Sequence, residues 1–67
     1  MRLVIEVERE DDGRWLAEVP ELPGVAAYGS TRDEAIRSVQ VLALRTVADR
    51  LEHGEAVPAT ALDIFAA

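Results

Sequence analysis

Carboxylates are the most frequent side chains in this sequence that could bind a metal or transfer a proton. Glu6 and Glu18 fall in neighbouring segments with a strand-like pattern, where two facing carboxylates could act as acid and base or hold divalent metals. Such a site needs further ligands, and the sequence places none at a defined spacing. We therefore interpret the acidic residues as a solvated edge and predict no metal site.

Nucleophilic catalysis has little support. The hydroxyl side chains have a single histidine, His53, as a possible base. His53 precedes Gly54, a pair typical of a helix C-terminus, where the imidazole complements the helix dipole. Cysteine is absent, and no phosphate loop, dinucleotide fingerprint or zinc spacing occurs. We predict that the chain is not an enzyme and needs no cofactor.

Binding is the remaining class of function. Tyr28 is expected to be exposed, whereas Trp15 and Leu22 are expected to pack inside. We predict Glu18, Glu21 and Tyr28 as contact residues, because they are polar or aromatic and lie on shaped backbone.

Three short segments show strand signals. Residues 3–8 and 14–19 alternate between apolar and polar positions, and the turn at residues 10–13 ends in Gly13, so the two segments are predicted to pair antiparallel. Residues 20–24, with two prolines, form a shaped connection to a third strand over residues 25–28.

A long helix is predicted over residues 32–52. Thr31 and Glu34 fit a capping box, in which Glu34 reaches back to the amide of the cap residue. The following residues form one apolar stripe suited to covering a sheet: Ala35, Ile36, Val39, Leu42, Ala43, Thr46 and Val47.

A second apolar row on this helix consists of Val41, Leu44 and Ala48. It offers more apolar surface than one sheet face requires, so it is a candidate contact between subunits. Scattered exposed apolar side chains are also ordinary on protein surfaces, and the row by itself fits both interpretations.

The end of the chain alternates again over residues 61–65, after Pro58 has stopped the helix, and we predict a fourth strand there. A strand that follows a helix crossover is expected parallel to the first strand and beside it. The predicted fold class is α+β with the order β-β-β-α-β: a small mixed sheet whose first three strands form an antiparallel meander, with one helix on one face.

The net charge of the chain limits the classes of molecule that it can bind. Thirteen acidic and seven basic residues give a net charge of −6, the wrong sign for binding nucleic acid phosphates. The charge suits a basic protein partner, or it serves solubility alone. Sixty-seven residues make one domain over residues 1–67 with a thin core, which oligomerisation would support. No apolar stretch is long enough for a membrane span, and we expect a cytoplasmic protein.

Residues 12–24 (DGRWLAEVPELPG), 28–35 (YGSTRDEA) and 54–58 (GEAVP) together resemble the HicB family of bacterial and archaeal antitoxins. The resemblance covers nearly the whole chain. It implies a partial RNase H-like fold without that enzyme's metal site, and a module that covers a small HicA-type toxin ribonuclease. It also implies a dimer or tetramer. Complete antitoxins of this family usually carry a DNA-binding segment, which we do not find in this sequence.

The leading hypothesis is therefore a homo-oligomeric HicB-like antitoxin module that occludes a basic HicA-like ribonuclease. One alternative is a stand-alone HicB-like scaffold without a toxin partner. Another is a residual nuclease that binds divalent metal through Glu6 and its neighbours. Direct DNA binding and membrane association are not expected.

Overall fold

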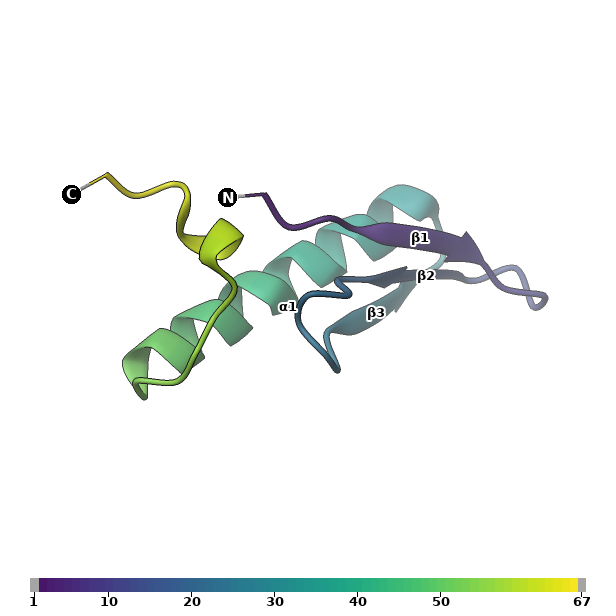
Figure 1. The fold of residues 1–67 in the computed structure, drawn as a ribbon. Helices are drawn as coiled ribbons and strands as arrows, with labels where there is room; N and C mark the ends of the chain where they lie inside the picture. The colour runs from purple at the N-terminus through teal and green to yellow at the C-terminus, as the bar shows by residue number, and fades with distance from the viewer. Residues whose placement is uncertain (1, 67) are drawn as a thin grey trace.

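The computed structural model describes residues 2–66, which form a small sheet followed by a long helix and a short 3-10 helix (Figure 1). The elements in chain order are β1 (Glu6–Arg9), β2 (Trp15–Glu18), β3 (Ala26–Gly29), α1 (Arg32–Glu52) and η1 (Ala59–Leu62). The α+β class and the β-β-β-α order are confirmed.

The three strands form an antiparallel meander in the order β1-β2-β3, as predicted. The turn between β1 and β2 closes through backbone bonds, with the Glu10 amide 2.7 Å from the Arg14 carbonyl oxygen. Gly13 has a φ of 88°, a left-handed value that glycine adopts without a Cβ clash.

The connection from β2 to β3 is a folded loop. The Leu22 amide donates to the Val19 carbonyl at 2.9 Å, and the Val25 amide donates to the Leu22 carbonyl at 2.9 Å. The Leu22 side chain is fully buried, as predicted. This loop is therefore anchored to the core and aims β3 back along β2.

Helix α1 begins at the predicted cap. The Thr31 hydroxyl oxygen accepts a hydrogen bond from the Glu34 amide at 3.1 Å. The Glu34 carboxylate accepts one from the Ser30 amide at 3.4 Å, rather than from the amide of Thr31 itself. The capping box therefore differs from the predicted one: the Glu34 side chain binds the amide of the residue before the cap, where the chain bends at Ser30 and Thr31.

The helix ends as the His53–Gly54 pair predicts. The Glu55 amide donates to the Arg50 carbonyl at 2.8 Å and the Gly54 amide donates to the Leu51 carbonyl at 3.2 Å, the two bonds of a Schellman motif. Gly54 takes the required positive φ of 71°.

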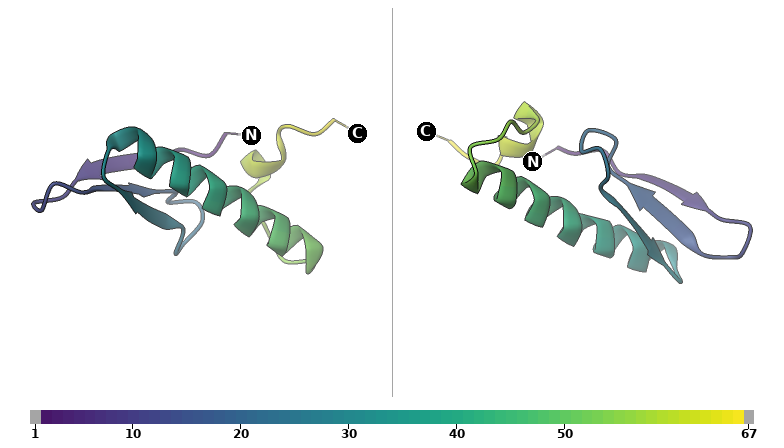
Figure 2. Two further views of the ribbon diagram at one scale, coloured as in Figure 1. Left: turned by 180° about the vertical axis from the view of Figure 1, so that it is seen from behind. Right: turned by 90° about the horizontal axis from the view of Figure 1, so that it is seen from below.

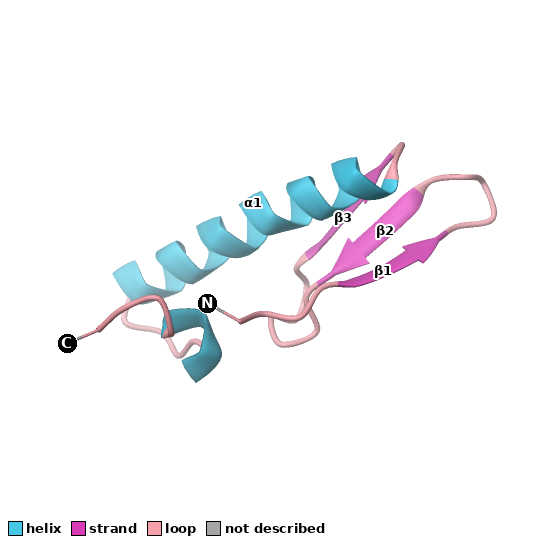
Figure 3. Ribbon diagram, turned by 90° about the horizontal axis from the view of Figure 1, so that it is seen from above, coloured by secondary structure: helices cyan, strands magenta, loops and turns pink. Residues whose placement is uncertain are grey.

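The core lies between α1 and the inner face of the sheet (Figure 3). Four residues of the predicted helix stripe are buried, whereas Ile36 and Thr46 are half-buried and Leu42 is 36% exposed. Trp15, predicted inside, is only half-buried, because it sits at the end of β2 with Arg9 beside its ring. The buried residues are Ala17, Val19, Leu22, Val25, Ala35, Val39, Ala43, Val47 and Ala61.

The predicted fourth strand is wrong. Residues 59–62 form the 3-10 helix η1, and the described part of the chain contains no strand after β3, so the sheet is antiparallel instead of mixed. The Ala61 amide donates to the Pro58 carbonyl at 2.9 Å, and the Phe65 amide donates to the Leu62 carbonyl at 3.0 Å. Short-range turns satisfy this backbone locally, while Ala61 fills the core.

The molecule is elongated, with extents of 44 × 20 × 15 Å. The C-terminal half of α1 extends past the sheet, and η1 folds back beside it near the start of the chain (Figures 1 and 2). The Arg2 amide donates a hydrogen bond to the Thr60 carbonyl at 3.1 Å, which links the N-terminal segment to η1.

Candidate functional site

The outer face of the sheet, opposite α1, is not covered by any element of the described chain (Figures 2 and 3). Strand alternation places Glu6 and Glu8 of β1 on this face, beside Leu16 and Glu18 of β2 and Tyr28 of β3. We call these five residues the acidic face. Two of the three predicted partner contacts, Glu18 and Tyr28, therefore lie together.

The carboxylates of the acidic face stand close in register. Glu6 is opposite Glu18 across β1 and β2, and Glu8 is opposite Leu16. All three carboxylates are on exposed residues, and within residues 2–66 no ion pair joins them to a cation. Like charges opposite each other on a sheet repel, so the approach of a positive group lowers the free energy of this face.

The alternative of a nuclease-type metal site at Glu6 and Glu18 lacks a third ligand. Among the described residues, the grouped metal-ligating side chains do not include Glu6 or Glu18.

Tyr28 is held by a stacked arginine. The Arg14 guanidinium lies 4.3 Å from the centroid of the Tyr28 ring, and its Nε donates to the Asp12 carboxylate at 2.7 Å. The Asp12 carboxylate also accepts from the Arg14 amide at 3.0 Å, and these hydrogen bonds, the backbone one foremost, lower the pKa of Asp12 from its ordinary 3.8. Tyr28 is 49% exposed, as predicted.

Glu21, the third predicted contact, has a partner within the chain. It lies in the loop between β2 and β3, where its carboxylate accepts a hydrogen bond from the Thr60 hydroxyl at 3.0 Å. Glu21 thereby ties this loop to η1. The signal for this role was absent from the sequence, because the two residues are 39 positions apart.

The predicted subunit contacts Val41, Leu44 and Ala48 are all exposed on α1. Leu44 and Ala48 line apolar hollows beside the helix, whereas Val41 lies outside both.

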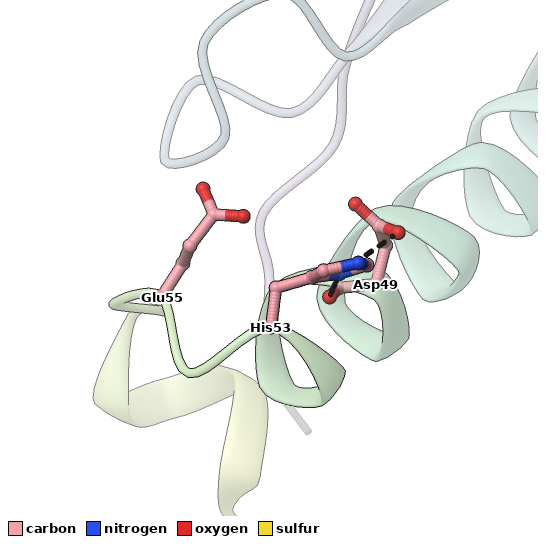
Figure 4. Close-up of side chains that lie close together, drawn as sticks. All are labelled: Asp49, His53 and Glu55. Atoms are coloured by element: carbon pink, nitrogen blue, oxygen red, sulfur yellow. Dashed lines mark hydrogen bonds and ion pairs between the residues drawn. The ribbon is translucent and has the colours of Figure 1, made fainter.

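A cluster that the sequence reasoning missed lies at the C-terminal end of α1 (Figure 4). One donor atom from each of Asp49, His53 and Glu55 lies within 4.8 Å of the others, and all three residues are exposed. The i, i+4 spacing of Asp49 and His53 was the available signal. His53 Nδ1 lies 2.7 Å from the Asp49 carbonyl oxygen and 3.4 Å from the Asp49 carboxylate. The imidazole therefore contacts the last turn of α1.

Three threonine hydroxyl groups make hydrogen bonds that support the fold. Thr31 caps α1, Thr46 donates to the Leu42 carbonyl at 2.8 Å, and Thr60 donates to Glu21. Among residues 2–66, no hydroxyl hydrogen-bonds to His53. No helix of this part of the chain combines the length and apolarity that crossing a bilayer demands.

Comparison with known proteins gives one informative similarity. The chain is similar to the UPF0150 protein Ta0767 of Thermoplasma acidophilum, with 26% identity over 58 residues that span 87% of this chain and 84% of that protein. No protein-family model matches the sequence, and no solved structure matches it.

Proposed function

We propose that this chain is a HicB-like antitoxin module that binds a small basic ribonuclease of the HicA type and covers its active surface. The observation that carries the proposal is the acidic face: an uncovered sheet surface with three exposed carboxylates, two of them directly opposite each other, and an exposed, stacked tyrosine.

The similarity to a UPF0150 protein supports the proposal, because UPF0150 corresponds to HicB-like antitoxins in the wider sense. The motifs over residues 12–24, 28–35 and 54–58 point the same way. In the structure these motifs build the turn before β2, the folded loop before β3, the cap of α1 and its exit, which are the features that shape and orient the sheet.

The physical mechanism is occlusion guided by charge. A ribonuclease that grips RNA phosphates carries a basic surface, and a partner with net charge −6 is drawn to it. Glu6, Glu8 and Glu18 meet the cations that would otherwise hold RNA. Tyr28 supplies a rigid aromatic contact whose rotation is already restricted by Arg14.

The test begins with co-expression of this chain and each small basic protein encoded next to it. We expect one such protein to arrest growth alone, to be neutral together with this chain, and to co-purify with it. Failure of every neighbouring basic protein to bind would overturn the proposal in favour of a stand-alone scaffold.

Charge reversal then locates the surface. Glu18→Lys should weaken binding of the basic protein by roughly tenfold or more, because a negative charge that attracts this protein is replaced by a positive charge that repels it. Glu52→Lys is the matched control, since it makes the same change at an exposed position at the end of α1, away from the sheet. Equal losses for both variants would show that net charge, and not the acidic face, governs binding.

A further inference from the structure

Three side chains that can bind a metal ion meet where α1 ends (Figure 4). Asp49 and His53 are four residues apart, so both lie on one face of the helix. Gly54, with its positive φ, reverses the chain, and the bond from the Glu55 amide to the Arg50 carbonyl returns Glu55 to the last helical turn. The exit of the helix thus gathers one imidazole and two carboxylates.

The spacing of the donor atoms approaches that of an occupied metal site. One donor atom of each side chain lies within 4.8 Å of the other two. Two ligands of a tetrahedral zinc ion, with bonds of about 2.0–2.1 Å, are separated by about 3.3 Å. All three residues are exposed, so rotations about their own side-chain bonds can move each donor by the required distance of about 1 Å.

The histidine is oriented as a metal ligand is. A carbonyl oxygen only accepts hydrogen bonds, so the contact of 2.7 Å between His53 Nδ1 and the Asp49 carbonyl oxygen places the ring proton on Nδ1. In the neutral ring, Nε2 then carries the free lone pair. Histidines that bind metals almost always hold one ring nitrogen by such a hydrogen bond and bind the ion through the other. The tautomer and the direction of the ring are therefore set before any ion arrives.

Within residues 2–66, no arginine pairs with either carboxylate of the cluster. Arg45 and Arg50 lie within about one turn of Asp49 along α1, and neither forms a salt bridge with Asp49 or with Glu55. A chain with a net charge of −6 attracts cations, and these two carboxylates are open to one.

We propose that Asp49, His53 and Glu55 form a site for a divalent transition-metal ion, with zinc as the best match. A donor set of imidazole nitrogen and carboxylate oxygen suits zinc, whereas calcium and magnesium take oxygen ligands. Three protein ligands leave the fourth tetrahedral position to a water molecule. The site lies on the part of α1 that extends past the sheet (Figure 1), so it is separate from the acidic face and from the proposed toxin contact.

A bound ion fastens the chain at the exit of the helix. Asp49 belongs to α1, His53 caps it, and Glu55 begins the segment that leads to η1. Binding of one ion to all three side chains fixes the direction of this segment, which carries Ala61 into the core. Because the unfolded chain does not hold the three donors together, the free energy of binding stabilises the folded state.

The first experiment is a calorimetric titration of the full chain with zinc chloride in a buffer that does not bind zinc. We expect one ion per chain and an affinity at least about a hundredfold higher than that for calcium chloride. Saturation with zinc should also raise the melting temperature by at least about 5 °C. A wild-type chain that binds no zinc, or that binds calcium equally well, overturns the proposal.

Glu55→Gln distinguishes the site from a general attraction of cations to an acidic surface. The substitution removes one ligand and should weaken zinc binding at least about tenfold, since even the partners that orient a ligand contribute about that much. Glu52→Gln is the matched control, because it makes the same change at an exposed position in the last turn of α1, outside the cluster. Its zinc affinity should stay within about twofold of the wild type, because exposed charges are screened. If the two variants lose affinity to the same extent, acidity alone attracts the ion and the proposal is wrong.

The second experiment uses the single histidine of the chain, whose ring signals identify the nitrogen that binds the ion. In nitrogen-15 NMR spectra, zinc should shift the His53 Nε2 resonance, and Nδ1 should keep the signal of a protonated nitrogen. Absence of any shift in the ring at saturating zinc overturns the proposal, and a shift that shows zinc on Nδ1 overturns the assigned geometry. Neither experiment includes a basic partner, so the outcome is independent of the proposed toxin binding.

Discussion

At the scale of residues, the turn between β1 and β2 shows how one carboxylate organises its surroundings. Asp12 accepts from both the amide and the guanidinium of Arg14, and the same guanidinium stacks on Tyr28. The orientation of the exposed aromatic ring thus depends on a charge at the turn. A single exposed ion pair contributes little to stability, and its value here is to restrict the ring.

This arrangement predicts a pH dependence. Because the folded-state pKa of Asp12 lies below 3.8, the ionised form stabilises the turn. That contribution is fully present above the unfolded-state pKa and is lost as the pH falls through the lower folded-state value. A carbon-13 NMR titration of the Asp12 carboxyl should give a midpoint below 3.8, and the Tyr28 ring signals should shift in the same range. In Asp12→Asn the Tyr28 signals should no longer follow this titration; a midpoint at or above 3.8 would contradict the arrangement.

At the scale of elements, the junction between β3 and α1 depends on the absence of a side chain. A Cβ at Gly29 would lie 2.9 Å from the Ala35 Cα and 2.9 Å from the Glu34 carbonyl carbon, with the Ala35 amide nitrogen also in its way. These atoms are backbone of the first helical turn and cannot move aside without shifting α1. Close approach of the helix to the sheet is thus possible only with glycine here.

Gly29→Ala should therefore lower the free energy of unfolding by about 3 kcal/mol, the upper end of the usual cost of overpacking. Gly24→Ala is the control, because a Cβ there meets open space and only the left-handed φ of 87° is strained. That strain costs about 1 kcal/mol. Urea unfolding followed by tryptophan fluorescence measures both. Equal losses would mean that the helix can withdraw from the sheet at little cost.

At the scale of the whole molecule, charge is unevenly distributed. Exposed carboxylates gather on the outer face of the sheet, while no charged residue lines the two hollows beside α1.

Self-repulsion gives a prediction at this scale. Raising sodium chloride from about 20 to 300 mM shortens the screening length and should raise the melting temperature by about 3 °C, corresponding to roughly half a kcal/mol. The effect should be smaller in Glu6→Gln, which removes one of two facing carboxylates. Thermal unfolding by circular dichroism checks both; a melting temperature that falls with salt would show that attractive ion pairs dominate.

The sequence by itself was enough to determine the local structure from the first strand to the end of α1. Alternation, a glycine at the turn and a capping threonine predicted three antiparallel strands and a helix over residues 32–52, because each signal acts over a few neighbouring residues. The exposure of Tyr28 and the burial of Leu22 followed from the same patterns.

Tertiary structure alone decided the rest. Five alternating residues at the end of the chain fit a strand or a series of turns equally well, and the outcome depended on Ala61 finding space in the core. The hydrogen bond between Glu21 and Thr60 and the cluster at His53 bring together side chains from different elements or across a turn. Such contacts depend on how the helix lies across the sheet, which no local pattern specifies.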